Sequence, residues 1–354
     1  MWNDIYQKTY RRKKMALTTV FCPECHCDTH KLHTTYTVAN GEKRQIHHCS
    51  ECENYFSETK NTPREGLKTP LSQINTVLDA LNEGMGINAA CRTFHIGKKS
   101  IKLWSKRLGG LKETLLLYAL CHRFVQLIIE GDELYTKVGK NQPASASKGW
   151  TIVLMERASR FIWELSCGEK DTALFNKAIE TLSLVIEQTD DLSLVTDGER
   201  RYGNILFDIC KEVIRTGEVG RPKTTLKEGV KVRVKNKGSQ SHKKGPKRPK
   251  YQAPQKEHPK TIQNLEDKET HANHVEAFNA ALRRRLSCYR RKTNTYAKES
   301  SSLQTRLDAQ WVLHNFVRPH FTLKQVPAVA LGILDKGLSW FELFRIPFFS
   351  SVLT

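Results

Sequence analysis

Four cysteines near the start of the chain constrain its folding more than any other feature. They form two Cys-x-x-Cys pairs, with 23 residues between the pairs. The residues between the pairs predict two strands joined by a turn at Asn40-Gly41, as in a hairpin. Four thiolates can close a tetrahedral zinc site, and so short a segment can hardly fold without a metal. The predicted ligands of Zn²⁺ are Cys22, Cys25, Cys49 and Cys52.

The choice of ligand atoms stays open, because the same segment holds other thiol and imidazole groups. These spare potential ligands are His26, Cys27, His47 and His48. The alternative, four free cysteines that share this spacing by coincidence, is the weaker interpretation, since the spacing closely fits zinc modules. Residues 20–60 are therefore predicted to form a zinc ribbon.

The chain is strongly basic. Its 354 residues hold 57 Lys and Arg against 37 Asp and Glu, which gives a net charge of +20 and a pI near 9.5. Such an excess favours a polyanionic partner, with binding that weakens as salt rises. A basic membrane-surface protein is the competing interpretation, but no long amphipathic basic helix is available for that role. The length suggests two or three domains.

Neither end of the chain has the pattern of a targeting or membrane segment. The apolar run at 338–354 is interrupted by charges and a proline, and it is too short to span a bilayer. The basic start lacks the uninterrupted apolar core of a signal peptide. Ten cysteines in so long a chain, four of them at metal spacing, favour a reducing compartment. We therefore expect a cytoplasmic protein without a membrane partner.

Residues 69–110 have the apolar spacing of helices. A first helix, capped by Ser72, precedes two short helices that flank a glycine-containing turn at 95–97. Two short helices around such a turn match the helix-turn-helix pattern, with Ile101 and Trp104 facing inward. The side chains expected to face DNA are Lys98, Lys99, Ser100, Lys102 and Lys106. A plain three-helix bundle with a solvated lysine face is the alternative.

From about residue 124 the pattern changes to strands and helices in alternation. Two apolar runs, at 124–132 and 192–198, predict strands that carry Asp132 and Asp197 at their ends. The pattern also predicts a hairpin and two helices, at 151–155, 161–165, 171–188 and 202–215. The order β, β, β, α, β, α is that of a ribonuclease-H-like core, whose central strands place acids at neighbouring ends.

A third acid, Glu276, lies on an amphipathic helix at 274–283. Two strand-end aspartates and a helical glutamate make an all-oxygen site suited to Mg²⁺ or Mn²⁺. Two such ions, ~3.5–4 Å apart, can activate one oxygen and stabilise the leaving oxygen in an in-line displacement at phosphorus. Nothing in the sequence resembles a nucleophilic triad. Asp132, Asp197 and Glu276 are therefore the predicted catalytic metal ligands.

Other polar residues lie close to these acids in the sequence. Glu130 and Glu133 flank Asp132, and we expect both to point to the opposite face of the strand. His271 and His274 lie at the start of the helix that carries the glutamate. Their ordinary interpretation is that of polar residues at a helix start, and the alternative is that they orient a water or bind DNA.

A basic, proline-rich stretch spans residues 219–262. Between residues 220 and 260 it holds 14 Lys or Arg against two Glu. Residues 230–235 alternate like a strand with one charged face, whereas 239–249 is too polar to build a core. We interpret the stretch as an insertion that forms an arm on the DNA backbone; a solvated disordered loop is the alternative. The side chains expected on the backbone are Lys243, Lys244, Lys247 and Arg248.

Several segments carry a resemblance to a known family. They are Asp132-Glu-Leu-Tyr-Thr-Lys-Val-Gly139, Thr196-Asp-Gly-Glu-Arg-Arg-Tyr202, and Glu276-Ala-Phe-Asn279 with Leu282-Arg283 after it. In this order they resemble the three catalytic motifs of transposases of the insertion-sequence-one family, a branch of the DDE transposases. The segment His314-Asn-Phe-Val-Arg-Pro-His320 resembles a tail that many DDE transposases share. The resemblance covers roughly residues 20–333.

This resemblance implies a DNA transposase that binds transposon ends and carries out metal-dependent 3′-end cleavage and strand transfer. Asp132, Asp197 and Glu276 would hold Mg²⁺ or Mn²⁺, Arg283 would contact substrate phosphate, and Asn279 would support the same face of the helix. The terminal repeats and target DNA would be the partners of a homodimer or larger assembly at the prokaryotic nucleoid. The basic insertion is longer than the compact form of the family leads us to expect.

The chain is therefore predicted to be a multi-domain α/β protein. Its expected parts are a basic N-terminal segment (1–19), the zinc ribbon (20–60), a helix-turn-helix domain (69–110), a ribonuclease-H-like catalytic domain (120–218 and 263–333), the basic insertion (219–262) and a C-terminal tail (334–354). Two other functions fit parts of this plan. A non-catalytic DNA-binding regulator would use residues 20–110, and a hydrolytic nuclease would cleave DNA without joining strands. The intact acids argue against the regulator, and the DNA-recognition modules argue against the nuclease.

Overall fold

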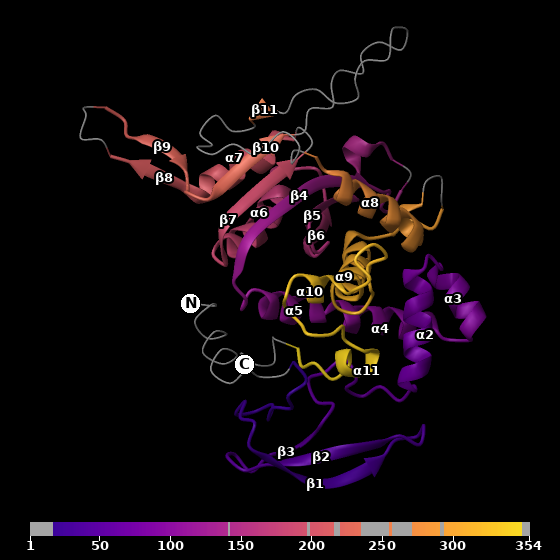
Figure 1. Cartoon of the computed structure of the whole chain (residues 1–354). Coiled ribbons are helices and arrows are strands. Elements are labelled where there is room, and N and C mark those ends of the chain that lie inside the picture. The colour runs from indigo at the N-terminus through magenta and orange to yellow at the C-terminus, as the bar shows by residue number, and fades with distance from the viewer. Residues whose placement is uncertain are drawn as a thin grey trace. The chain divides into compact units, whose positions relative to one another are not determined.

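The chain divides into two compact units, whose elements are labelled in Figure 1. Unit 1 contains residues 1–121, 284–295 and 304–354, and unit 2 contains residues 122–283 and 296–303. The computed structural model describes residues 17–140, 142–196, 199–215, 220–234, 255–256, 271–290 and 294–348. Each unit combines a β-sheet with helices, which confirms the α/β class. The domain ranges expected from the sequence stay a prediction.

Unit 1 begins with a three-stranded antiparallel sheet in the order β1-β2-β3. The strands are β1 (His30–Thr37), β2 (Lys43–Cys49) and β3 (Tyr55–Ser57). The predicted turn joins β1 to β2: Gly41 takes φ +82°, which favours glycine, and Asn40 Oδ1 accepts a hydrogen bond from the amide two residues on at 3.0 Å. Cys22, Cys49 and Phe56 form the buried cluster of this segment. The predicted hairpin is thus confirmed, with cysteines in its core.

Four helices follow in unit 1, and the first three match the predicted helices. They are α2 (Leu71–Asn82), α3 (Ile87–Phe94), α4 (Lys98–Gly109) and α5 (Leu111–Ala119). Helices α2, α3 and α4 pack against one another, and Ile101 and Trp104 of α4 are buried as predicted. The expected cap is wrong, because Pro70 is the N-cap of α2 and Ser72 lies inside its first turn. Proline already has the φ that this position adopts.

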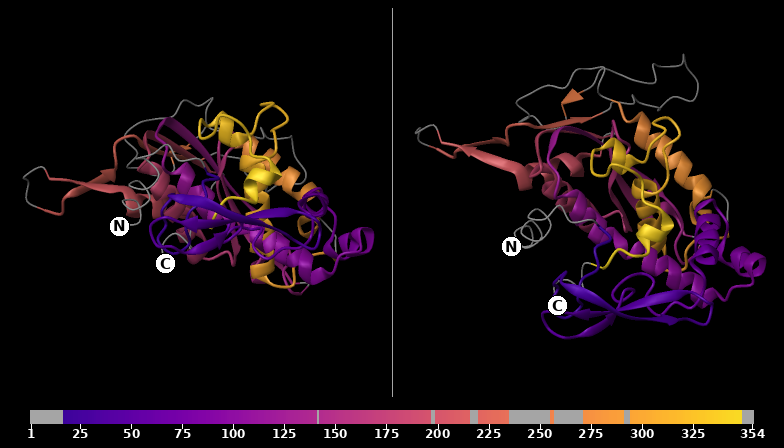
Figure 2. Two further views of the ribbon diagram at one scale, coloured as in Figure 1. Left: turned by 90° about the horizontal axis from the view of Figure 1, so that it is seen from below. Right: turned by 60° about the horizontal axis from the view of Figure 1, so that its bottom comes forward.

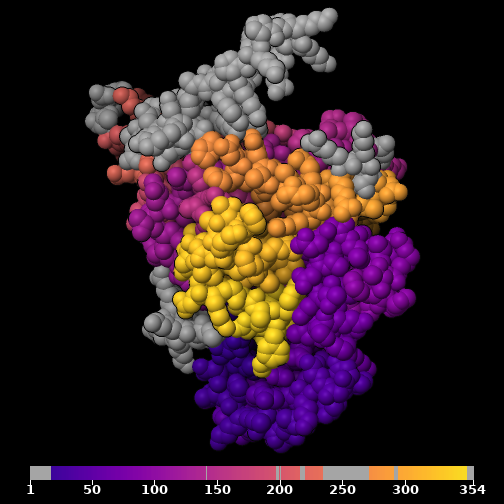
Figure 3. All heavy atoms as spheres, turned by 45° about the vertical axis from the view of Figure 1, so that its right-hand side comes forward, coloured from indigo at the N-terminus to yellow at the C-terminus, as the bar shows by residue number. Residues whose placement is uncertain are grey.

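The C-terminal part of unit 1 packs against the ribbon and helices of the same unit (Figure 3). Its elements are η3 (Ser287–Tyr289), the portion of α9 (Ser300–Phe316) from residue 304 on, α10 (Pro327–Ala330) and α11 (Trp340–Leu343). Arg306 is buried and donates to the Leu81 carbonyl oxygen at 2.9 Å. Leu343, Phe344 and Ile346 are fully buried. These three residues of the expected C-terminal tail (334–354) therefore belong to the core of unit 1.

A six-stranded sheet forms the centre of unit 2, in the order β11-β10-β7-β4-β5-β6 (Figures 1 and 2). The strands are β4 (Phe124–Tyr135), β5 (Trp150–Glu156), β6 (Ile162–Gly168), β7 (Thr189–Thr196), β10 (Val230–Val234) and β11 (Gln255–Lys256). Strands β4, β5 and β6 pair antiparallel, whereas β7 pairs parallel with both β4 and β10. The predicted hairpin and the two predicted apolar strands are therefore confirmed.

Helices α6 (Thr172–Ile186) and α7 (Arg200–Cys210) lie on one side of this sheet. Gly131, within β4, faces them: a Cβ there would come within 3.2 Å of the Leu154 and Thr196 side chains and 3.8 Å of the Tyr202 ring. A side chain there would therefore crowd the Leu154 and Thr196 side chains of the neighbouring strands. After α7, strands β8 (Lys211–Ile214) and β9 (Lys223–Leu226) form a hairpin that projects from the sheet in Figures 1 and 2. A short 3₁₀ turn, η1 (Ala144–Ala146), precedes β5.

Part of the expected basic insertion belongs to the central sheet. Strand β10 pairs with β7 along its whole length, from Val230 opposite Leu192 to Val234 opposite Thr196. Val230 and Val232 are buried, so the alternating pattern does form a strand, but its apolar face packs in the core. Residues 230–234 of the expected insertion (219–262) therefore form part of the sheet. The lysines and arginine expected on the DNA backbone lie outside the described residues: Lys243, Lys244, Lys247 and Arg248.

Within the described residues, none of the helices is both long enough and apolar enough to cross a membrane.

Candidate metal centres

Strand β4 and helix α8 (Asn273–Arg285) meet at two points in unit 2. At the first point, Asn279 Nδ2 donates to Asp132 Oδ2 at 2.8 Å. Asn279 is only 3% exposed, whereas Asp132 is partly exposed. The other oxygen of Asp132 accepts a hydrogen bond from the Glu133 amide at 2.9 Å. The fold thus joins two residues that are 147 positions apart in the sequence.

Glu130 makes the second contact, with the first turn of α8. Its side chain is 0% exposed, and it accepts hydrogen bonds from the backbone amides of His274 and Val275, both at 3.0 Å. The Arg157 Nε donates to the same carboxylate at 2.8 Å, and His274 Nδ1 lies 3.0 Å from it. Burial opposes ionisation of this carboxyl, but the hydrogen bonds and the guanidinium outweigh it and lower the pKa of Glu130.

The expectation that Glu130 points away from Asp132 is wrong. Side chains alternate along a strand, so residues two apart share a face, and both of these acids contact α8. For Glu133 the expectation is confirmed, because this residue lies on the other face, where its carboxylate is 3.3 Å from the Lys170 ammonium. Glu133 is therefore directed away from the face that carries Asp132.

The sequence predicted that Asp132 ends its strand, and this prediction is wrong. Strand β4 continues to Tyr135, because β5 pairs with it over that whole stretch. On the other side, pairing with β7 stops at Glu130, which lies opposite Val195. Asp132 therefore lies just beyond the end of the parallel pairing. Strand β7 ends at Thr196, and Asp197, the next residue, lies outside the described residues.

Glu276 lies on α8 between the two contact points. It follows Val275 by one residue and precedes Asn279 by three. Residues three apart lie on the same side of a helix, so Glu276 and Asn279 share a side of α8. Arg283 lies a further four residues on, again on this side, and like Glu276 it is partly exposed. The structure thus brings the first and third sequence motifs together on one face of the sheet.

A second group of residues at this place could hold a metal ion. Ligand atoms of Glu130, His271 and His274 lie within 4.8 Å of one another, with His271 Nδ1 3.7 Å from Glu130 Oε1. Two imidazoles and one carboxylate make a donor set suited to transition metals. Sequence reasoning missed this cluster, because it placed Glu130 on the wrong face. The period of two along β4 is the signal that could have found it.

The four predicted zinc ligands come together in unit 1. The sulfurs of Cys22, Cys25, Cys49 and Cys52 lie within 4.8 Å of one another. Cys22 Sγ is 3.4 Å from Cys52 Sγ, and Cys25 Sγ is 3.5 Å from Cys49 Sγ. Cys27 Sγ lies 3.2 Å from the sulfurs of both Cys25 and Cys49, so the centre holds a fifth thiol. Four sulfurs at this spacing fit the donor set of a structural Zn²⁺ site.

The surroundings of Cys49 favour a thiolate. Burial opposes its ionisation, but hydrogen bonds from the Cys52 and Glu51 amides and from the neighbouring thiols lower the pKa of Cys49 to about 6. The deprotonated sulfur is the form that binds zinc. Among the other spare ligands, His47 packs against the Phe56 ring and His48 against the Tyr55 ring, with centroids 5.7 and 4.6 Å apart.

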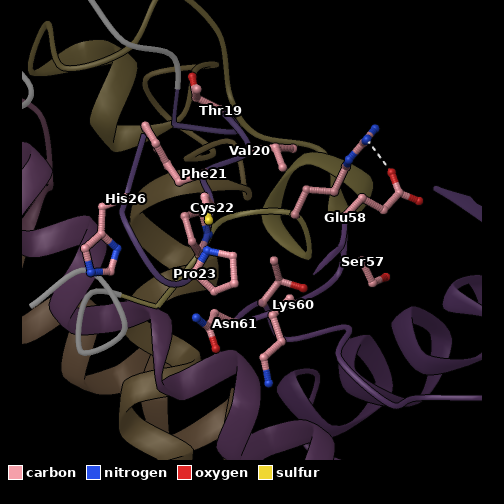
Figure 4. A pocket seen from close by; sticks show the side chains of 13 residues that line it. Thr19, Val20, Phe21, Cys22, Pro23, His26, Ser57, Glu58, Lys60 and Asn61 are labelled. Carbon is pink, nitrogen blue, oxygen red and sulfur yellow. Dashed lines mark hydrogen bonds and ion pairs between the residues drawn. The ribbon is translucent and has the colours of Figure 1, made fainter. Parts of the chain in front are cut away.

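A hollow beside the cysteine centre is bounded on one side by the C-terminal part of unit 1 (Figure 4). Cys22 and Glu58 line it from the ribbon, and Arg345 lines it from the chain after α11. The Arg345 guanidinium and the Glu58 carboxylate form an ion pair at 2.9 Å, drawn as a dashed line in Figure 4. Close by, the Phe348 amide donates to the Asn61 carbonyl oxygen at 2.8 Å. These contacts attach the C-terminal part to the segment that carries the cysteines.

Helix α4 presents lysines on its solvent side. The predicted DNA-facing residues are all exposed or, for the serine, partly exposed: Lys98, Lys99, Ser100, Lys102 and Lys106. Lys99, Lys102 and Lys106 are spaced three and four apart, so they form one stripe along the helix. Such a stripe suits a helix that contacts DNA phosphates, and it suits a solvated face equally well.

Comparisons with known proteins do not assign the chain to a family. No protein-family model and no curated protein sequence matches it. Among solved structures, the chain is similar to a crystal structure of the Mos1 mariner paired-end complex with Mn. The TM-score is 0.16 at 10% identity, and the match covers 41% of this chain and 58% of that chain. A similarity this low defines neither the fold nor the function of the chain.

Proposed function

We propose that the chain is a DDE transposase, similar to those of the insertion-sequence-one family. It would bind transposon ends and carry out metal-dependent 3′-end cleavage and strand transfer. The observation that carries the proposal is the hydrogen bond between Asp132 and Asn279. This contact holds the helix that carries Glu276 against the strand that carries Asp132, so the first and third motifs meet on one face of the sheet.

The topology of unit 2 supports a ribonuclease-H-like core for this activity. Three antiparallel strands, β4 to β6, are followed on the other side of β4 by two parallel strands, β7 and β10. The first acidic motif begins within β4, and the second begins at the last residue of its parallel neighbour β7. In the proposed core β10 is the fifth strand, and the hairpin β8–β9 is inserted before it.

The proposed metal ligands are Asp132, Asp197 and Glu276, because Mg²⁺ and Mn²⁺ prefer carboxylate oxygens. When bound, the metal ions would supply Lewis-acid stabilisation of the charge that develops at the reacting phosphate. Asn279 fixes one oxygen of Asp132, so this carboxylate does not have to reorient when DNA arrives. Arg283, two helical turns after Glu276, would pair with a substrate phosphate.

DNA recognition would be the task of unit 1. Helices α3 and α4 flank a short turn, in which His95 takes φ +54°, and α4 exposes the stripe of lysines. We infer that these helices form a helix-turn-helix and that the cysteine centre is a zinc ribbon. Terminal repeats and target DNA would be the ligands of a homodimer or larger assembly, since two ends have to be joined.

Strand cleavage and joining by the purified, zinc-loaded protein tests the proposal. The substrate is the DNA that flanks its own gene, with and without Mg²⁺ or Mn²⁺. We expect cleaved and joined strands, and only when the metal is present. Cleavage without joining would identify a hydrolytic nuclease, and tight binding without a metal-dependent product would identify a regulator. Either result would overturn the proposed function.

A further inference from the structure

A buried carboxylate lies beside the proposed catalytic site without being one of its ligands. Glu130 is 0% exposed and shares a face of β4 with Asp132. The Arg157 guanidinium and two backbone amides of α8 donate to it, at 2.8, 3.0 and 3.0 Å. A buried charge persists when it is paired and hydrogen-bonded in this way. Such a carboxylate is not available to reacting groups, but it holds its donors in place.

Two of these donors belong to the start of a helix. The first amides of an α-helix have no partner within the helix, and they carry partial positive charge that favours an anion. A capping side chain ordinarily lies just before the helix, whereas Glu130 is 144 residues away from the His274 amide. This cap therefore ties α8 to β4. Arg157 extends the tie, because its Nη2 donates to the His271 carbonyl oxygen at 2.6 Å, just before the helix.

The two contacts hold α8 against β4, and they also fix the position of the helix along the strand. Glu130 and Asp132 are two strand residues apart, ~6.6 Å. Their partners Val275 and Asn279 are four helical residues apart, ~6 Å. Because the two spacings match, both contacts can form at once, and Glu276 lies within the matched stretch. A slip of α8 by one turn would move Glu276 by ~5.4 Å along the strand.

Metal binding by Glu130, His271 and His274 is the alternative role of this cluster. The Arg157 guanidinium argues against it, because its positive charge lies 2.8 Å from Glu130 Oε1, the oxygen that faces both histidines. A metal cation there would be repelled at short range. The other oxygen, Oε2, is already occupied by the two amides of α8.

We propose that Glu130 is a positioning residue that clamps the start of α8 onto β4 and so holds Glu276 beside Asp132. The inference rests on the proposed function, since it assigns a task within the same site. Glu130 itself contacts neither metal nor DNA. Without its charge, the His274 and Val275 amides would lose their anionic partner, so the start of α8 would be held less firmly and Glu276 would sample other positions.

Glu130→Gln tests the clamp, and Glu156→Gln is its matched control. Glu156 is likewise a buried carboxylate of unit 2, at 3% exposure, and it accepts hydrogen bonds from the Ala158 and Ser159 amides at 2.9 and 2.6 Å. Those amides belong to the turn between β5 and β6 and not to α8. Both variants lose a buried charge that caps backbone amides, so both are expected to unfold at lower temperature.

Hydrogen exchange at the His274 and Val275 amides is the first readout, because it does not depend on activity. We expect these amides to exchange ~10-fold faster in Glu130→Gln and at the wild-type rate in Glu156→Gln. Mn²⁺-dependent cleavage is the second readout. Glu130→Gln is expected to need ~10–100-fold more Mn²⁺ for half-maximal cleavage, with unchanged end binding, whereas folded Glu156→Gln should need no more than wild type.

Four results would overturn the proposal. The first is wild-type exchange at these amides in Glu130→Gln. The second is faster exchange with an unchanged Mn²⁺ requirement, and the third is an equal change of that requirement in the control variant. The fourth is the loss of one bound Zn²⁺ or Mn²⁺ in Glu130→Gln, which would make the cluster a metal site. If the wild-type protein fails to cleave DNA, the proposed function fails, whereas the exchange rates still decide whether the clamp exists.

Discussion

The two candidate metal centres of this chain are built in opposite ways. The cysteine centre takes its ligands from residues 22–52, and one small sheet brings them together. The acidic centre depends on contacts such as that between Asp132 and Asn279, which are 147 residues apart. A local set of ligands can be recognised from spacing alone. A distant set becomes a site only through strand pairing and through the contacts that place a helix on the sheet.

The two centres also differ in how far their folding depends on metal binding. The cysteine segment is short, so in the proposed zinc ribbon metal binding would supply much of the free energy of folding. The proposed acidic centre lies on a large sheet with its own apolar core, so we expect unit 2 to fold without the proposed metal. Substitutions should therefore unfold the first centre and disable the second without unfolding it.

The largest effect is expected from Glu276→Gln. It removes one charge from the proposed metal site and leaves the shape of the side chain, so cleavage should fall by at least ~10³-fold. End binding and the midpoint of thermal unfolding should stay at their wild-type values. Single-turnover cleavage and a gel-shift titration measure the two properties. Cleavage within about tenfold of wild type would remove Glu276 from the site.

The next effect is expected from Cys49→Ser, compared with Cys27→Ser. The first variant loses a buried thiolate, so we expect it to lose its zinc, to unfold the ribbon and to weaken end binding. The second variant keeps all four predicted ligands and should keep one zinc per chain. Metal analysis of the purified proteins measures this. An equal loss of zinc in both variants would place Cys27 among the ligands.

A smaller effect is expected from Asn279→Ala. Asp132 would lose the hydrogen bond that orients its carboxylate, as happens when the outer partner of a metal ligand is removed. Cleavage at a fixed, limiting Mn²⁺ concentration should fall ~10–100-fold and recover in part at high Mn²⁺. A loss that no concentration of Mn²⁺ relieves would indicate a role other than orienting the ligand.

The smallest effect is expected from Lys102→Ala on α4. Loss of one phosphate contact should weaken end binding several-fold and lower the slope of log affinity against log salt by ~1. Lys177→Ala, on the exposed side of α6, is the control and should change neither quantity. Identical salt slopes in all three proteins would support the solvated lysine face instead.

The sequence predicted the parts of the fold whose signals are local. The hairpin at Asn40-Gly41 and the helices of unit 1 follow from turn residues and apolar spacing. The place of β10 in the central sheet could not be predicted, because strand pairing is a long-range contact. Its charged face resembled a solvent-exposed one, yet Lys231 pairs with Asp191 of β7 at 2.9 Å.

For the candidate site, too, the sequence predicted the local motifs but not the contacts between distant residues. The motifs pointed to Asp132 and to the helix that carries Glu276, but no local pattern could reveal that Asn279 bonds to Asp132. The role of Glu130 was missed for a different reason, since strand periodicity was applied wrongly to it. Its partners at the start of α8 could not be found from the sequence in any case, because they lie far along the chain.

The most direct test of this account compares two neighbouring acids on opposite faces of β4. Asp132→Asn and Glu133→Gln are assayed side by side for Mg²⁺-dependent cleavage of end DNA, with end binding as the measure of folded protein. We expect Asp132→Asn to bind DNA without cleaving it, and Glu133→Gln to cleave it at close to the wild-type rate. Cleavage by Asp132→Asn at the wild-type rate would contradict the proposed site.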